Sequence, residues 1–167
     1  MACARESRYV SNRESQCEKS VLVRTRLSFV GYAVGSCSQA NMSGTFRDLK
    51  SWQKAFDLAL DVYPVTRCFP REEMYGLTSQ LRRAAVSVLS NIAEGKGRAS
   101  DKDLLRFLGN AKGSLFELET QLALAERLSY LAKTEAQRLQ DEITETGKLL
   151  SGLMRAFDQA PHSMSVA

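Results

Sequence analysis

The stretch LLRFLGNAKGSLFELETQLALA, residues 104–125, decides the fold of this 167-residue chain. Its apolar residues recur at intervals that alternate between four and three, which is the spacing of a buried helix face in a bundle or coiled coil. That face consists of Leu104, Leu108, Ala111, Leu115, Leu118, Leu122 and Ala125. The pattern predicts a helix that follows a cap at Ser100 and runs to about Tyr130, a length of roughly 45 Å at about 1.5 Å per residue.

Three further helical patterns accompany this stretch. The first places Leu49, Trp52, Phe56, Leu60 and Tyr63 on one face, with Pro64 kinking or ending the helix. The second consists of Leu77, Leu81, Ala84 or Ala85, Val88 and Ile92, and it runs out at Gly95 and Gly97. The last consists of Leu139, Ile143, Thr146, Leu150, Leu153 and Phe157. No strand-like alternation follows Met42, so the sequence predicts an all-α fold, an antiparallel up-down four-helix bundle over residues 42–158.

The first 41 residues differ in character from the rest. They show no sustained helical or alternating period, and they contain three of the four cysteines and six Arg or Lys against three Glu. We interpret residues 1–41 as a disordered or irregular extension, or as the product of a start site assigned upstream of a natural start at Met42. A signal peptide is less favoured, because the charged segment before Leu27 is too long. Residues 159–167 are interpreted as a C-terminal tail.

Composition excludes several classes of function. The residues after 41 carry 17 basic and 16 acidic side chains, so net charge gives little support for a nucleic-acid partner. Cys68 is their only cysteine, which fits a reducing cytoplasm. The only histidine, His162, lies in the tail, so neither a di-metal site nor a Ser–His or Cys–His arrangement can be built in the bundle. With no apolar run near the roughly 20 residues that cross a bilayer, we expect a cytoplasmic protein without a membrane segment, cofactor, bound metal or enzymatic activity.

The second and third helices carry apolar residues on more than one face. These additional sectors consist of Val86, Leu89 and Ala93 on the second helix and of Leu105, Phe116 and Ala123 on the third. A helix in a lone bundle needs only one apolar stripe, so we predict contacts between subunits and a homo-oligomer. The third helix also contains Gly109 and Gly113, each of which costs about 1 kcal/mol relative to alanine. We expect them to permit close approach of the small-residue face of the second helix.

A strip of polar side chains lies beside the core face of the second helix, and the third helix has a counterpart. The two strips consist of Gln80, Arg83, Ser87, Asn91 and Glu94, and of Arg106, Asn110, Ser114, Glu117 and Gln121. One interpretation is a solvated face with weak surface ion pairs. The other is a polar cleft that binds a small polar ligand, or a network of hydrogen bonds between the two helices, because serine and asparagine are poor choices for an exposed helix interior. Arg83 and Glu117 are the ion pair we expect across it.

The turn between these helices is a second candidate site. Its glycines, the cations near it and the following helix N-terminus could hold an anion or an RNA backbone. The candidate contacts are Arg82, Lys96, Arg98 and Lys102. The turn matches neither a Walker loop nor a dinucleotide-binding fingerprint, so a plain helix cap and loop is the alternative interpretation.

Three long segments carry a resemblance to a known family. They are FRDLKSWQKAFDLALDVY, FPREEMYGLTSQLRRAAVSVLSNIAEGKGR and FLGNAKGSLFELETQLALA. Together they resemble the four-helix bundle proteins of the 23S rRNA intervening-sequence family, over about Phe46 to Phe157. The positions that match the family's shared polar residues are Gln80, Arg83, Ser87, Asn91, Glu94, Gly95, Arg98, Ser114, Glu117 and Gln121.

The resemblance implies a bacterial cytoplasmic protein that assembles as a ring-like homopentamer and has no catalytic activity. A related group, the accessory proteins of diversity-generating retroelements, works with nucleic acid but is markedly more basic than this chain. We therefore expect a non-enzymatic, homo-oligomeric scaffold, with RNA as a candidate partner. The alternatives are the small-ligand cleft between the second and third helices and a purely structural protein–protein interaction module.

Overall fold

The computed structural model describes residues 44–158, and within this range the chain forms helices and no strands. The four long helices are α2 (Lys50–Thr66), α3 (Leu77–Lys96), α4 (Asp101–Arg127) and α5 (Lys133–Asp158). Two short 3-10 helices, η2 (Phe46–Asp48) and η3 (Arg71–Met74), precede α2 and α3. Our interpretations of residues 1–41 and 159–167 lie outside the described residues.

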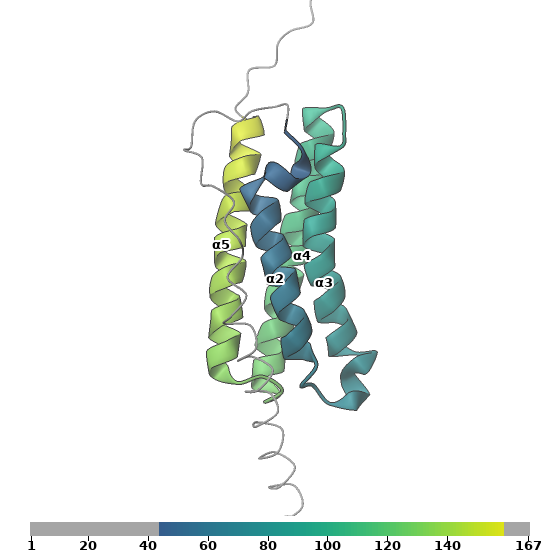
Figure 1. Ribbon diagram of the computed structural model, residues 1–167, viewed down its shortest axis with the longest axis vertical. Helices are drawn as coiled ribbons and strands as arrows, with labels where there is room; N and C mark the ends of the chain where they lie inside the picture. The colour runs from purple at the N-terminus through teal and green to yellow at the C-terminus, as the bar shows by residue number, and fades with distance from the viewer. Residues whose placement is uncertain (1–43, 159–167) are drawn as a thin grey trace, which may run out of the picture.

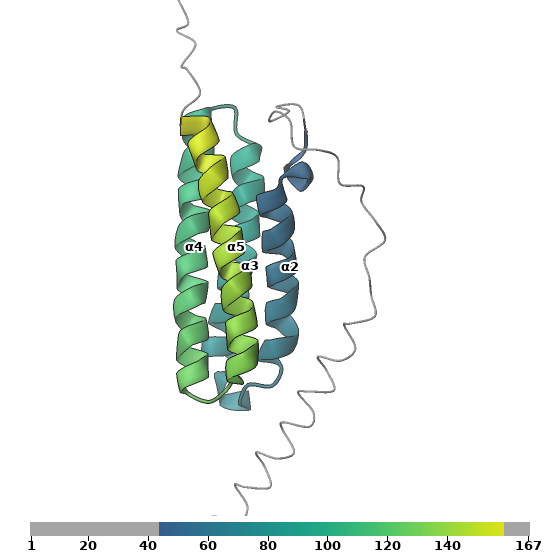
Figure 2. The same cartoon turned by 90° about the vertical axis from the view of Figure 1, so that its left-hand side faces the viewer.

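The four long helices run alternately up and down around one core (Figures 1 and 2). Both α2 and α4 pack against α3 and α5, and the contact between α3 and α4 is the most extensive. Since four helices make an even number of passes, the first and last described residues lie at the same end of the bundle. The α3–α4 turn lies at that end too, at the top of Figure 1. The predicted antiparallel four-helix bundle is therefore confirmed.

The leucine-rich face from which we predicted α4 lies at the centre of the core. All seven of its residues are buried, and Leu108 and Leu118 have no exposed surface. Burying a leucine side chain contributes about 1.5–3 kcal/mol relative to leaving it in water, so this face supplies a large part of the stability. Ser100 is the N-cap residue of α4, although its side chain makes no capping hydrogen bond. The helix ends at Arg127, shortly before Ser129 adopts a left-handed φ of 58°.

The face that we predicted for the first helix is not its core face. The core residues of α2 are mostly small, namely Ser51, Ala55, Leu58, Ala59, Val62, Val65 and Thr66. In contrast, Phe56, Leu60 and Tyr63 are 42%, 43% and 41% exposed. Small side chains let α2 approach α3 and α5 closely, so the larger residues lie at the flank. Pro64 does not end the helix, which continues to Thr66.

The predicted role of the glycines in α4 is wrong. A Cβ atom added at Gly109 or Gly113 would meet nothing within 4 Å, because both glycines lie on the exposed side of α4. The close approach between α3 and α4 occurs at Gly95 instead. A Cβ atom there would lie 2.9 Å from Phe107 Cβ and 3.1 Å from Leu104 Cδ1. The missing side chain of Gly95 therefore allows the end of α3 to pack against the first turns of α4.

Candidate functional site

The middle of the polar strip is a contact between α3 and α4. The hydroxyl oxygens of Ser87 and Ser114 lie 2.8 Å apart and share a hydrogen bond. Asn91 Nδ2 donates to the Ser87 carbonyl at 2.8 Å and to Ser87 Oγ at 3.1 Å. All three residues are half-buried. These hydrogen bonds hold the two helices together, whereas ligand binding by the strip stays a prediction.

The outer part of the strip forms contacts within single helices. Arg83 Nη2 donates to Gln80 Oε1 at 2.6 Å, and Gln121 Nε2 donates to Glu117 Oε1 at 2.9 Å. The ion pair that we expected between Arg83 and Glu117 is therefore not formed in the described part of the chain. Both side chains are exposed and find partners three or four residues away, where no long side chain has to cross between helices.

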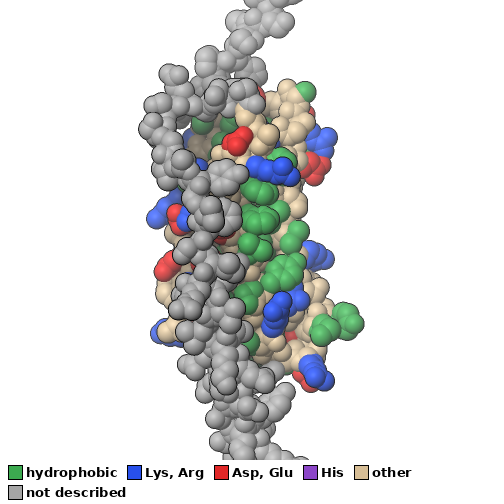
Figure 3. Space-filling view, in the orientation of Figure 1, with side chains coloured by type: hydrophobic (Ala, Val, Ile, Leu, Met, Phe, Trp, Pro, Cys, Tyr) green, Lys and Arg blue, Asp and Glu red, His purple; other side chains and the backbone are tan. Residues whose placement is uncertain are grey.

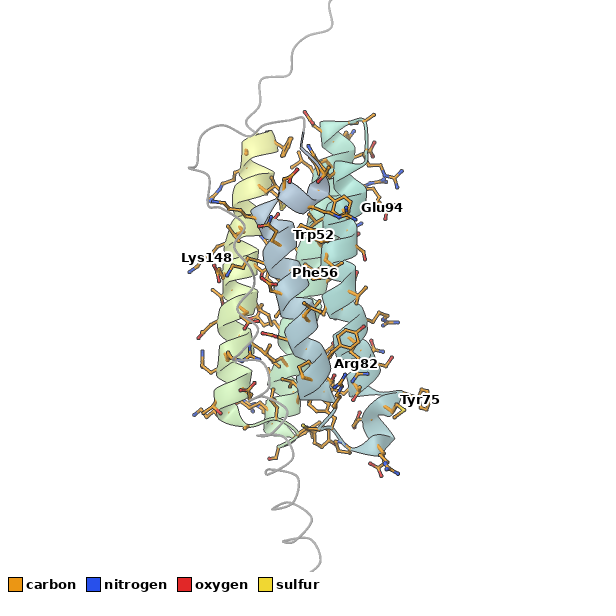
Figure 4. The ribbon with its side chains drawn as sticks, in the orientation of Figure 1. Trp52, Phe56, Tyr75, Arg82, Glu94 and Lys148 are labelled. Carbon is orange, nitrogen blue, oxygen red and sulfur yellow. The ribbon has the colours of Figure 1, made fainter. Side chains whose placement is uncertain are left out.

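The four cations assigned to an anion site do not form one cluster. Arg82 lies near the start of α3 (Figure 4), whereas Lys96, Arg98 and Lys102 lie around the α3–α4 turn at the other end. Arg82 Nε donates to Thr66 Oγ1 at 2.8 Å, and its guanidinium lies 5.0 Å from the centre of the Tyr63 ring. Arg98 pairs with Glu94 and covers the Phe107 ring. Of the four, only Lys102 is both exposed and without an ion pair among residues 44–158.

The side of the bundle formed by α2 and α3 exposes a band of large apolar side chains. We call it the α2/α3 apolar face, and it consists of Trp52, Phe56, Leu60, Tyr63 and Val86. Trp52 and Phe56 are stacked with ring centres 5.2 Å apart, and both lie on the front of α2 in Figure 4. Figure 3 shows hydrophobic side chains running along this side of the molecule. The face contains Val86 of the predicted second sector of α3, and Leu89 and Ala93 of that sector are half-buried.

A cluster of charged side chains joins α2 to α5 on the opposite flank of α2. Arg138 Nη1 lies 2.6 Å from Asp61 Oδ2 and 2.6 Å from Glu142 Oε1, and Arg138 Nη2 lies 3.2 Å from Glu135 Oε2. Three carboxylates therefore surround one guanidinium. Burial and, to a lesser extent, the negative charge of Asp61 together raise the pKa of the Glu142 carboxyl to about 7, although the positive charge of Arg138 opposes the rise. We did not predict this cluster, because its residues come from two helices that are far apart in the chain.

A groove of about 410 Å³ lies between α4 and α5. Its lining includes the cations Lys112, Lys148 and Arg155, and Figure 4 shows Lys148 on the outer side of α5. Phe116, which belongs to the predicted second sector of α4, lines it too and is 55% exposed. We did not predict this groove. The spacing of Lys148, Ser151 and Arg155 shows that they share a helix face, but no sequence signal joins them to Lys112.

Other kinds of site are not found in the described residues. Within residues 44–158, no group of three or more His, Cys, Asp or Glu side chains is arranged so that it could hold a metal ion. No helix of that range has the length and apolar character needed to span a membrane. The described residues do expose one apolar surface, the α2/α3 apolar face, and one groove lined by cations, the groove between α4 and α5.

Comparisons with known proteins agree with the fold. The family described as 23S rRNA-intervening sequence protein matches residues 47–152. Among solved structures, a protein of unknown function from the S23 ribosomal protein family of Bacteroides thetaiotaomicron is 23% identical, with a TM-score of 0.59. The matched region covers 63% of this chain and 95% of that one. Comparison with curated proteins gives no match.

The likeness to the solved structure shows a shared fold, and the family match adds the sequence relationship. The family match spans well over half of the chain and includes most of each of the four long helices. The resemblance stated from three sequence segments is thereby confirmed. The chain belongs to the family of 23S rRNA-intervening sequence proteins.

Proposed function

We propose that the protein is a non-enzymatic, homo-oligomeric helical scaffold whose copies meet through the α2/α3 apolar face. The observation that carries the proposal is the exposure of that face. Phe56, Leu60, Tyr63 and Val86 are 39–43% exposed. Contiguous exposed apolar surface on a small domain marks an interaction site, and aromatic residues are enriched in the buried centres of interfaces.

A second exposed apolar surface supports a ring. Leu124 and Leu128 are 50% and 45% exposed and lie one turn apart, Leu124 in the last turn of α4 and Leu128 at its C-cap. Since α4 is the helix diagonally across the bundle from α2, this surface and the α2/α3 apolar face point in different directions. Contact between two different surfaces of successive copies builds a ring when the rotation closes. The homopentamer implied by the family resemblance is one such ring.

Light scattering on the parent and two variants tests the assembly. Phe56→Glu and Leu60→Glu place a charge on the α2/α3 apolar face, and we expect them to shift the molar mass towards that of a monomer. Met74→Glu is the matched control, because Met74 is 55% exposed but belongs to η3, outside both apolar surfaces. A monomeric parent would refute the proposal, as would variants that keep the parent's mass.

RNA is the macromolecule that we propose as the partner of the scaffold. The family's description names the 23S rRNA intervening sequence. Lys102, which forms no ion pair within residues 44–158, supplies a cation for a phosphate beside the α3–α4 turn. A structured RNA should bind with an affinity that falls steeply as salt rises, because phosphate contacts release counterions. Absence of binding even at low salt would rule this part out while leaving the assembly proposal intact.

A further inference from the structure

The α4/α5 groove carries positive charge that its surroundings do not neutralise. Lys112, Lys148 and Arg155 line it, and within residues 44–158 none of them forms an ion pair. The only carboxylate in the lining is Glu119, whose Oε1 accepts a hydrogen bond from Gln140 Nε2 at 2.8 Å. Three cations against one carboxylate attract an anionic occupant.

The floor of the same groove is apolar. It is formed by Leu115, Ile143 and Gly147, and a Cβ atom added at Gly147 would lie 3.3 Å from Leu115 Cδ2. The absence of a side chain at Gly147 therefore gives the groove its depth. The Phe116 ring lies at the edge, and Lys112 Nζ lies 5.8 Å from its centre. Because Phe116 is 55% exposed, its ring keeps free surface for another flat group.

We infer that this groove binds single-stranded RNA, with a base stacked on Phe116 and phosphates held by Lys112, Lys148 and Arg155. The inference rests on RNA being the partner under the proposed function, and it names the place of contact. Non-specific single-strand sites combine cations that follow the backbone with aromatic side chains on which bases stack. The groove brings both together, whereas at the α3–α4 turn Arg98 is already paired with Glu94.

An acidic amphipathic helix fits the groove less well. A helix bound in a groove needs apolar anchor sites over successive turns. Here the hydrogen bond between Gln140 and Glu119 joins the polar side chains of α5 and α4 one turn beyond Ile143 and Leu115, and it limits the apolar floor. A volume of about 410 Å³ suits one or two nucleotides better than the side of a helix.

Fluorescence anisotropy with a labelled single-stranded RNA of about 12 nucleotides tests the inference. Three phosphate contacts predict a slope of about −2 when the logarithm of the affinity is plotted against that of the salt concentration between about 50 and 200 mM. Lys148→Gln should reduce the steepness by about 0.7. Lys133→Gln, an exposed lysine at the start of α5 and outside the groove, is the charge-matched control and should leave the slope unchanged.

Phe116→Leu separates base stacking from charge. Loss of one stacked base should weaken RNA binding by about 5- to 160-fold. The same variant should bind inorganic polyphosphate, which has no bases, as the parent does. Circular dichroism shows whether each variant keeps its helical fold. If Phe116→Leu folds but does not bind RNA, Phe116→Tyr, which keeps an aromatic ring, should bind RNA as the parent does.

The possible results distinguish this inference from the function on which it rests. If the parent binds RNA and both Lys148→Gln and Phe116→Leu bind it equally well, the groove is not the site, although RNA remains the partner. If no RNA binds at low salt, the RNA part of the proposed function falls together with the groove. If polyglutamate competes as strongly as RNA and Phe116→Leu has no effect, the groove prefers acidic polypeptides and the inference is overturned.

Discussion

Replacing Glu142 by glutamine should stabilise the bundle at pH 8. In the cluster between α2 and α5, Glu142 shares the guanidinium of Arg138 with Asp61 and Glu135. One cation cannot compensate three carboxylates in a partly buried position. The neutral glutamine keeps the shape of the side chain and removes the charge that the site disfavours.

The magnitude follows from the pKa of the Glu142 carboxyl, which rises from 4.5 to about 7. This rise corresponds to at most about 3.4 kcal/mol, at about 1.36 kcal/mol per pH unit. The side chain is 30% exposed, so solvent screening reduces the expected gain to about 1–2 kcal/mol.

The direction of the Glu142 pKa shift determines the pH range over which the stability of Glu142→Gln differs from that of the parent. Because the pKa is higher in the folded state than in the unfolded state, the folded protein holds this proton more tightly. The stability contributed by protonated Glu142 is fully present below about pH 4.5 and is lost as the pH rises through about 7. The parent should therefore lose stability over this range, whereas Glu142→Gln should lose less, and the two proteins should approach each other at pH 4.5.

Urea unfolding at several pH values, at fixed protein concentration, measures the free energy of unfolding. Glu145→Gln is the matched control. Glu145 lies one turn after Glu142 on α5, its side chain is 53% exposed, and it pairs with Lys54 of α2. It removes the same charge without the burial and should show no gain at pH 8. If Glu142→Gln is less stable than the parent at pH 8, the attraction to Arg138 outweighs the burial and the repulsion, and the reasoning is wrong.

Two further predictions concern α3 and α4 and are measured by thermal or urea unfolding. Gly109→Ala and Gly113→Ala should each raise the free energy of unfolding by about 1 kcal/mol, because alanine favours a helix more than glycine does and the added methyl group meets no atom. Gly95→Ala should lower the free energy of unfolding, because its methyl group would press against Phe107. A Gly109→Ala variant that is less stable than the parent would contradict this reasoning. Ser87→Ala and Ser114→Ala should each cost about 1 kcal/mol and the double variant little more than either, because the two hydroxyls bond each other; fully additive losses would show that the hydrogen bond contributes nothing.

Much of the fold is predictable from the sequence, because the core faces of α3, α4 and α5 contain most of the large apolar residues of these helices. α2 is the exception. Its sequence contains two apolar faces, and the face with the aromatic residues was wrongly predicted to point into the core. The small residues Ala55 and Ala59 form the core face with Leu58 and Val62. Hydrophobic periodicity weighs large residues most heavily, whereas packing between helices favours small ones where backbones lie close together.

The candidate sites are harder to predict, because each depends on contacts between helices. The spacing along α3 correctly placed Ser87 and Asn91 beside α4, where they meet Ser114. It could not show that Arg83 bonds to Gln80 instead of Glu117. Nor could it show that Lys112 and Lys148, which are 36 residues apart in the chain, line one groove. Periodicity indicates which residues share a face, but the rotation and offset of neighbouring helices decide which faces meet.

The first and last described residues lie at the same end of the bundle, and this gives any cyclic assembly two unlike rims. Rotational symmetry about a ring axis places equivalent parts of every copy on the same side. In a ring whose axis runs along the helices, one rim would carry all the α3–α4 turns together with every junction to residues 1–43 and 159–167. The opposite rim would carry the η3 segments and the α4–α5 connections (Figure 1). A protein domain that replaces residues 1–43 or residues 159–167 would then be attached at one rim alone and would leave the other rim open to a partner.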